Sequence, residues 1–223
     1  MNGIETTIYF YTRNDAFIVN NILCGNMDFL WENIKPLLDD NNGILKEHEN
    51  GLRPPLDDIT INRLQSRIYG ELDEAAKKKI LKTAWDDIHN ITRAMEPAKS
   101  NVKLYRTVIT VDNDPRPYIN LLGNCKKEDM IEFKNISSTS AAPGWGENSG
   151  HGFYRYKISV PKNFPILELD RFKCRNEEGE ILLPPMKCRI SAIYNDLSEK
   201  CRGVFDLDLI ESVPINGDIY EYN

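Results

Sequence analysis

Toward its C-terminal end the chain reads NEEGEILLPP, residues 176–185. Three carboxylates within four positions stand directly before an apolar run and a double proline. In a strand, Glu178 and Glu180 would point to the same face, and two carboxylates at that spacing repel, so that one holds its proton more tightly. Such a pair suits catalysis, in which one carboxylate stays ionised beside a cation while the other moves a proton. A solvated acidic turn explains the same residues, and for Glu-x-Glu alone it is the better interpretation.

The sequence around this stretch is typical of strands. Alternating, β-branched segments cover residues 102–111, 153–161, 166–169, 181–183, 187–194 and 204–213. Their short lengths and frequent turns predict a β-sandwich or mixed sheet in the C-terminal half.

The N-terminal half, up to about residue 100, reads as helical. Apolar spacing predicts helices over residues 4–23, 29–38 and 58–95, with a stop at 39–43 and a break at 50–55. The longest of these, 58–95, has a polar, solvated middle at 71–79 and a row of candidate core residues: Ile61, Leu64, Ile68, Leu72, Ile80, Trp85, Ile88 and Ile91. Helices followed by strands predict an α+β fold.

Composition limits the function classes. The 223 residues suit one domain or a domain with a helical extension, and the net charge of −6 argues against nucleic acid as the main partner. The five cysteines include no Cys-x-x-Cys pair, which argues against zinc and for a reducing compartment. The start of the chain lacks the pattern of a signal peptide, and no apolar run approaches a membrane span.

Two further strands carry candidate site residues. Arg106 lies in the alternating segment 104–111, where burying it requires a carboxylate or a phosphate partner; a structural ion pair is an equally good interpretation. Residues 133–140 read FKNISSTS, and their alternating hydroxyls form either a ladder toward a ligand or an exposed edge strand.

The segment 141–152 is a Gly-rich loop. It does not match a phosphate-binding fingerprint, because glycine is missing at Ser149 and no Lys-Ser/Thr follows. Trp145 and His151 are candidates to cover a ligand from this loop, or side chains packed on the surface.

Taken in order, these motifs resemble the Arg-Ser-Glu class of mono-ADP-ribosyltransferases. Leu104-Tyr105-Arg106 is similar to the family's Tyr-Arg strand, and residues 133–140 to its strand leading into Ser-Thr-Ser. Residues 178–184 closely match its Glu-x-Glu-apolar-Leu-Leu-Pro motif, and residues 158–161 its strand ending in Val-Pro. The resemblance implies one ADP-ribosyltransferase domain over 1–223, with a mainly helical part, 1–100, before a mixed or antiparallel β-sandwich, 101–223.

The resemblance also implies the chemistry. NAD would be the substrate, with no metal required. Glu180 would stabilise the cationic ribose, Glu178 would activate the acceptor, Arg106 would clamp the NAD phosphates, and Ser138 would hold Glu180 and the ribose. Thr139 and Ser140 would shape the NAD pocket.

One position departs from the family's pattern, and one role in the family has two candidate residues here. Thr107 stands where the family often has glycine, which changes the backbone contact to nicotinamide. Trp145 and Phe153 both compete for the aromatic position that stacks on nicotinamide.

The first glutamate of Glu-x-Glu implies an arginine acceptor on another protein, which Phe172 or Arg175 would contact. We therefore expect a monomeric, secreted effector without a Sec signal, acting on a host protein in a target-cell cytosol; a cytoplasmic enzyme is the other possibility. Alternatives are an NAD glycohydrolase, a transferase modifying another residue, and an inactive partner-binding module. A glycosidase would use two carboxylates but leaves Arg106 and Ser-Thr-Ser unexplained.

Overall fold

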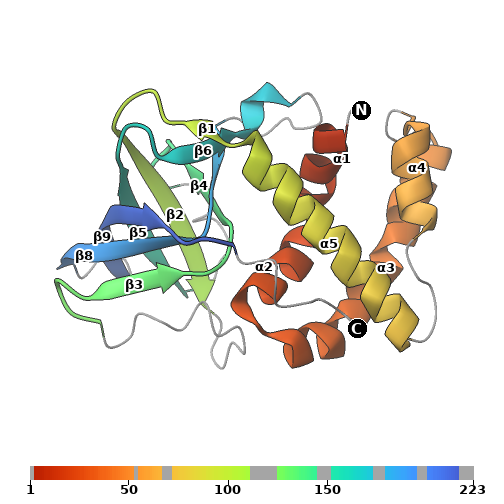
Figure 1. Cartoon of the computed structure of the whole chain (residues 1–223), viewed down its shortest axis with the longest axis horizontal. Helices are drawn as coiled ribbons and strands as arrows, with labels where there is room; N and C mark the ends of the chain where they lie inside the picture. The colour runs from red at the N-terminus through yellow and green to blue at the C-terminus, as the bar shows by residue number, and fades with distance from the viewer. Residues whose placement is uncertain are drawn as a thin grey trace. The chain divides into compact units, whose positions relative to one another are not determined.

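The computed structural model of the chain (Figure 1) describes residues 3–52, 55–66, 72–110, 125–144, 152–172, 179–194 and 200–215. The chain divides into two compact units. A helical unit comprises Met1–Ala94 and Phe172–Cys174, and a β unit comprises Met95–Arg171 and Arg175–Asn223. The α+β prediction is confirmed, with the last described α-helix ending at Ala94 and the first strand beginning at Glu96.

The helical unit is built from amphipathic helices. They are α1 (Gly3–Phe10), the π-helical η1 (Tyr11–Asp15), α2 (Ala16–Cys24), α3 (Met27–Glu49), α4 (Asp58–Gln65) and α5 (Glu74–Ala94). On α5 the buried Ala84, Ile88 and Ile91 recur at intervals of three and four residues, so they form one apolar stripe. This stripe accounts for the packing of α5 against α1 and α2.

Two sequence-based helix predictions are wrong. The helix predicted to stop at 39–43 continues through these residues as part of α3. Just beyond them, Ile44 is buried with Tyr9, Phe10 and Leu64, and this packing outweighs the low helix propensity of Asp, Asn and Gly.

The predicted helix over 58–95 is instead two helices. The first, α4, ends at Gln65, and the hydroxyl of Ser66 donates to the carbonyl of Arg63 at 2.9 Å. The second, α5, begins after Asp73, whose carboxylate accepts the N–H of Ala76 at 2.7 Å. Local side-chain bonds to the backbone therefore end one helix and start the next.

The strands of the β unit form one mixed sheet. They are β1 (Glu96–Pro97), β2 (Val102–Thr110), β3 (Met130–Phe133), β4 (Ser137–Ser140), β5 (Gly152–Val160), β6 (Pro165–Glu168), β7 (Glu180–Leu183), β8 (Met186–Tyr194) and β9 (Cys201–Ser212), with the 3-10 turn η4 (Leu169–Arg171) after β6. Their spatial order is β1-β6-β7-β4-β2-β5-β9-β8-β3. The β5–β9 pair is parallel and the other pairs are antiparallel.

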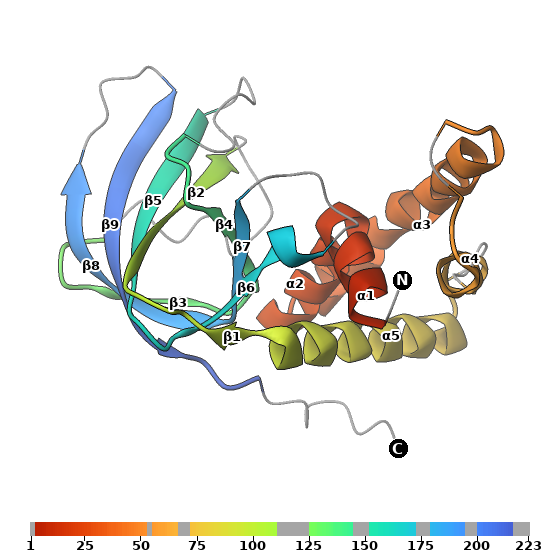
Figure 2. The same cartoon turned by 90° about the horizontal axis from the view of Figure 1, so that it is seen from above.

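This sheet encloses its own core. Figure 2 shows its strong curvature from β8 through β5 to β7. Side chains from strands far apart in the spatial order meet in one apolar cluster, which includes Phe133 of β3 and Leu183 of β7. The six predicted strands are present, with ends shifted by at most a few residues. The segment 133–140 contains the end of β3 and the whole of β4.

Candidate active site

Three neighbouring strands bring the predicted motifs together. In the order β7-β4-β2, the hydroxyl strand β4 lies between the strand that begins with Glu180 and the strand that carries Arg106. Ser140 is directly opposite Glu180 on β7 and opposite Tyr105 on β2. Motifs separated by 74 residues of sequence, from Arg106 to Glu180, are thus two strands apart in space.

Glu180 shares a face with two serines. Residues directly opposite in an antiparallel pair point to the same side, and side chains alternate along a strand. The register therefore puts Ser140 and Ser138 on the face of Glu180. The carboxylate-bearing residue is only 3% exposed, and Ser140 is 1% exposed. A buried carboxylate is costly without polar neighbours, and the serine hydroxyls supply such neighbours.

Glycine is required at the residue before Glu180. Gly179 has φ of +78°, a left-handed conformation that side chains with a Cβ rarely adopt. A Cβ at this position would lie 3.6 Å from Oγ of Ser140, which is ordinary contact. The positive φ, rather than lack of space, therefore requires glycine between Glu178 and Glu180. Directly after this glycine the chain enters β7, whose first residue is Glu180.

Thr139 lies on the opposite face of β4. Its hydroxyl donates to the carbonyl of Ile181 at 2.7 Å, and its side chain is buried. In this structure the threonine therefore ties β4 to β7, one position beyond the Ser140–Glu180 pair.

Arg106 contacts the hydroxyl strand from the face of the sheet opposite to that of Glu180. Its neighbour Tyr105 is the residue opposite Ser140, and side chains alternate along a strand. On β2 the side chain of Arg106 alternates onto the face of Leu104 and Val108, both buried in the core, and it lies opposite Tyr156. Its Nη1 donates to the carbonyl of Ser138 at 3.1 Å, so the cation contacts the backbone of the hydroxyl strand. Burial raises the pKa of Tyr156, and the charge of Arg106 opposes that shift.

Three other predicted site residues lie at defined places. Thr107 is partly exposed and alternates onto the face of Tyr105. Phe153 is 4% exposed and buried with Cys201 and Val204, so its ring offers almost no free surface for stacking. Phe172 follows η4 and is partly exposed.

The remaining predicted residues lie outside the described part of the chain. They are Glu178, Trp145, His151 and Arg175. Within the described part, no group of three His, Cys, Asp or Glu side chains could hold a metal ion. No described helix combines the length and apolar character needed to cross a membrane.

Comparison with known proteins places the fold. No protein-family model matches the sequence, and no curated protein matches it either. Solved structures do match. The Salmonella SpvB ATR domain aligns with a TM-score of 0.59 at 14% identity, covering 95% of this chain and 100% of that chain.

Two clostridial structures also align with this chain. The Clostridium limosum C3 exoenzyme has a TM-score of 0.51 at 16% identity, covering 95% of this chain and 86% of that chain. An ADP-ribosyltransferase from Clostridium botulinum has a TM-score of 0.50 at 16% identity, covering 95% of this chain and 88% of that chain. This chain has the ADP-ribosyltransferase fold. Identities this low establish the fold alone, so the resemblance noted in the sequence is confirmed at the level of architecture.

One residue near the site was not singled out in the sequence, where it belongs only to a turn, 170–177, that would meet the target protein. The carboxylate of Asp170 accepts the N–H of Gly179 with its two oxygens at 3.0 and 3.2 Å. Aspartate commonly bonds backbone N–H groups in turns, and Asp170 opens the segment that ends at a glycine. This pattern indicates that Asp170 accepts a hydrogen bond from a nearby backbone N–H, but it does not specify which residue donates that bond.

Proposed function

We propose that the chain is an NAD-dependent mono-ADP-ribosyltransferase that transfers ADP-ribose to an arginine side chain of a target protein and releases nicotinamide. The observation that carries this proposal is the buried Glu180 on the face of Ser138 and Ser140, with the guanidinium of Arg106 bonded to the backbone of the same hydroxyl strand. A lone acidic turn would be solvated, whereas Glu180 is 3% exposed. The fold shared with the ADP-ribosyltransferase from Clostridium botulinum agrees with this chemistry.

Glu180 stabilises the sugar in this proposal. Cleavage of the bond between nicotinamide and ribose develops positive charge on the ribose, and a nearby carboxylate offsets it. Burial strengthens that interaction, because water does not screen it. Ser138 lies diagonally across from Glu180 and would orient both the carboxylate and the ribose hydroxyl.

Arg106 would bind the diphosphate of NAD. A guanidinium suits phosphate because its planar N–H groups match phosphate oxygens, and its bond to the Ser138 carbonyl holds it beside β4. Ser140 would shape the pocket wall, Thr139 would support that wall from the opposite face of β4 by its bond to β7, and the backbone at Thr107 would approach nicotinamide. Trp145 is the preferred stacking residue, since the ring of Phe153 is buried.

Glu178 would act on the acceptor. A guanidinium nitrogen of the acceptor attacks the ribose carbon as the bond to nicotinamide breaks, and nicotinamide leaves with the bonding electron pair. The attacking nitrogen loses one proton, which Glu178 accepts as general base. The sum is NAD⁺ and arginine giving ADP-ribosyl-arginine, nicotinamide and one proton.

The partner in this proposal is a host protein with an accessible arginine, which Phe172 and Arg175 would contact. The chain would act as a monomeric, secreted effector in the cytosol of a target cell. The bacterial origin of the structural neighbours, one of which is an exoenzyme, supports this part of the proposal.

Substitution of Glu180 tests the proposal. We expect Glu180→Gln to lower kcat for nicotinamide release by about 100-fold or more, because glutamine keeps the size of the side chain and removes the charge that stabilises the transition state. Glu211→Gln is a matched control on β9, where Glu211 pairs with Lys187 at 3.1 Å. The measurement is steady-state release of nicotinamide from NAD.

The outcomes separate the alternatives. Equal rates for Glu180→Gln and wild type contradict the assignment of Glu180. Release that is undiminished without a protein acceptor favours an NAD glycohydrolase. A wild-type protein that neither cleaves NAD nor gains thermal stability from it contradicts the proposal and favours the partner-binding module, because a bound ligand stabilises the folded state.

A further inference from the structure

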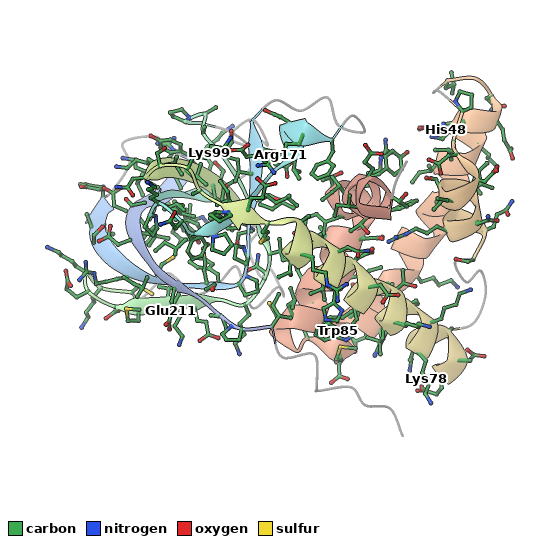
Figure 3. The ribbon with its side chains drawn as sticks, turned by 45° about the horizontal axis from the view of Figure 1, so that its top comes forward. His48, Lys78, Trp85, Lys99, Arg171 and Glu211 are labelled. Carbon is green, nitrogen blue, oxygen red and sulfur yellow. The ribbon has the colours of Figure 1, made fainter. Side chains whose placement is uncertain are left out.

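The 3-10 turn η4 is fixed on both sides of Asp170. Leu169 is fully buried, which anchors the start of the turn in the core. Arg171, labelled in Figure 3, donates to Glu96 at 2.7 Å and lies 3.5 Å from Glu168. The hydrogen bond and charge of Arg171 lower the pKa of Glu96, as expected for this pair. Asp170 therefore lies in a turn whose position is fixed by the burial of Leu169 and by the ion pairs of Arg171.

The carboxylate of Asp170 crosses to the start of β7. Both of its oxygens lie within hydrogen-bond distance of the Gly179 nitrogen, at 3.0 and 3.2 Å. An N–H donor to a carboxylate makes a charge-assisted bond, which is stronger than a bond between neutral groups. This bond joins residues nine positions apart in the sequence, on either side of the segment that contains Glu178.

The bond holds the N–H of Gly179, the residue directly before Glu180. Gly179 has φ of +78°, and the ladder to β4 begins with the next residue, opposite Ser140. Glycine visits many backbone conformations, so an external partner is needed to hold it in one. The Asp170 carboxylate supplies that partner on one side, and the β4–β7 ladder supplies it on the other.

We propose that Asp170 is a positioning residue for the catalytic reaction: through the N–H of Gly179 it holds Glu180 in place against the ribose of NAD. This inference rests on the proposed function. Asp170 itself does not touch the reacting atoms. Its effect is to keep the carboxylate of Glu180 within the narrow geometry that transition-state stabilisation demands.

Two substitutions at Asp170 test the proposal. Asp170→Ala removes the acceptor, and we expect kcat for nicotinamide release to fall by about 10- to 100-fold, with KM for NAD changed by less than about threefold. Asp170→Asn retains an amide oxygen that can accept the same N–H, so we expect kcat within about fivefold of wild type.

The chain provides a matched control at another turn. Asp129 is also exposed and accepts a backbone N–H, that of Lys126, at 2.7 Å. Asp129→Ala removes the same kind of bond before β3, so we expect kcat for nicotinamide release to stay within about twofold of wild type. A fall equal to that of Asp170→Ala would mean that general loosening of the β unit explains the effect, and it would overturn the proposal.

Hydrogen exchange separates this inference from the proposed function. We expect the amide of Gly179 to exchange at least about tenfold faster in Asp170→Ala than in wild type, since its acceptor is gone. Unchanged exchange overturns the proposal, as does faster exchange with unchanged kcat. A wild-type protein that cleaves no NAD overturns the proposed function and the catalytic role of Asp170 together, while faster exchange in that case still establishes the bond between Asp170 and Gly179.

Discussion

Gly179 and Glu180 have different structural roles at the start of β7. The glycine takes the left-handed backbone conformation, with φ of +78°, and the glutamate becomes the buried first residue of the strand. The ladder between β4 and β7 then holds Glu180 opposite Ser140. A flexible residue and a fixed carboxylate thus stand side by side, and the first determines where the second points.

Substitution of Gly179 tests this division of roles. We expect Gly179→Ala to lower the free energy of unfolding by about 1–2 kcal/mol, because a Cβ is strained at positive φ. We also expect kcat for nicotinamide release to fall about tenfold, since relief of the strain moves Glu180. Chemical denaturation and steady-state kinetics measure the two effects.

Gly25 supplies the control for that experiment. It ends α2 with φ of 73°, and a Cβ added there would have no atom within 4 Å. Gly25→Ala therefore carries the same backbone strain in the helical unit, and we expect a similar loss of stability without loss of catalysis. Equal kinetic losses in both variants would contradict a special role for Gly179.

The sequence predicts the chemistry of single residues better than their geometry. The resemblance that rests on the order of the arginine, Ser-Thr-Ser and Glu-x-Glu motifs implies that Glu180 and Ser138 lie near one another, and the β4–β7 register puts them on one face. Alternation puts Thr139 on the face opposite to the two serines, but only the pairing of the strands defines which of these faces carries Glu180. The contact between Asp170 and Gly179 depends on a turn that no periodicity describes.

At the scale of elements, a buried ionic junction holds the helices together. Arg63 of α4 donates to Asp15 of η1 at 3.0 Å and also pairs with Asp87 of α5. Thr7 of α1 donates to Asp87 at 2.9 Å. Two buried carboxylates thus share one guanidinium, whose carbon lies 4.7 Å from the centre of the Phe10 ring. Removing a partner from such a junction leaves uncompensated buried charge.

The junction predicts a pH dependence of stability. Burial raises the pKa of Asp87, although the charge of Arg63 opposes the shift. With the folded pKa above the unfolded value of about 3.9, the contribution of Asp87 is fully present below that value and is lost as pH rises through the folded pKa. Asparagine at this position cannot titrate.

We therefore expect Asp87→Asn to gain stability relative to wild type as pH is raised from about 3 to 7. Urea denaturation across this range measures the difference in unfolding free energy. Asp58→Asn, on the exposed first turn of α4, sets the baseline for loss of a surface carboxylate. An unfolding free energy of Asp87→Asn that stays constant or falls relative to wild type as pH rises would contradict the raised pKa of Asp87.

Element boundaries depend on contacts that the sequence does not contain. The alternation of apolar and polar residues in the sequence predicted β2 and β5 well. This is because the burial of a strand residue depends on the face of the sheet to which its side chain points. Residues 39–43 look like a helix stop, yet α3 runs through them and delivers Ile44 to the core. A locally unfavourable segment remains helical when the packing beyond it compensates.

At the scale of the whole molecule, a helical unit precedes a β unit that carries the candidate catalytic residues. With a net charge of −6, the anionic dinucleotide of the proposed function would have to be bound by local cations, for which Arg106, bonded to the backbone of the hydroxyl strand, is the candidate. The ADP-ribosyltransferase fold is common to this chain and proteins only 14–16% identical to it. Function therefore rests on the site rather than on the fold.

The most direct test is transfer of labelled ADP-ribose from NAD to agmatine, a small guanidinium compound that stands in for the acceptor arginine. We predict labelled agmatine and an equal amount of nicotinamide with the wild-type protein. With Glu178→Ala we expect loss of transfer and retention of some NAD hydrolysis, because the acceptor is no longer deprotonated. Nicotinamide release without labelled agmatine would contradict an arginine acceptor, and no release of nicotinamide at all would contradict the central claim that this chain is an ADP-ribosyltransferase.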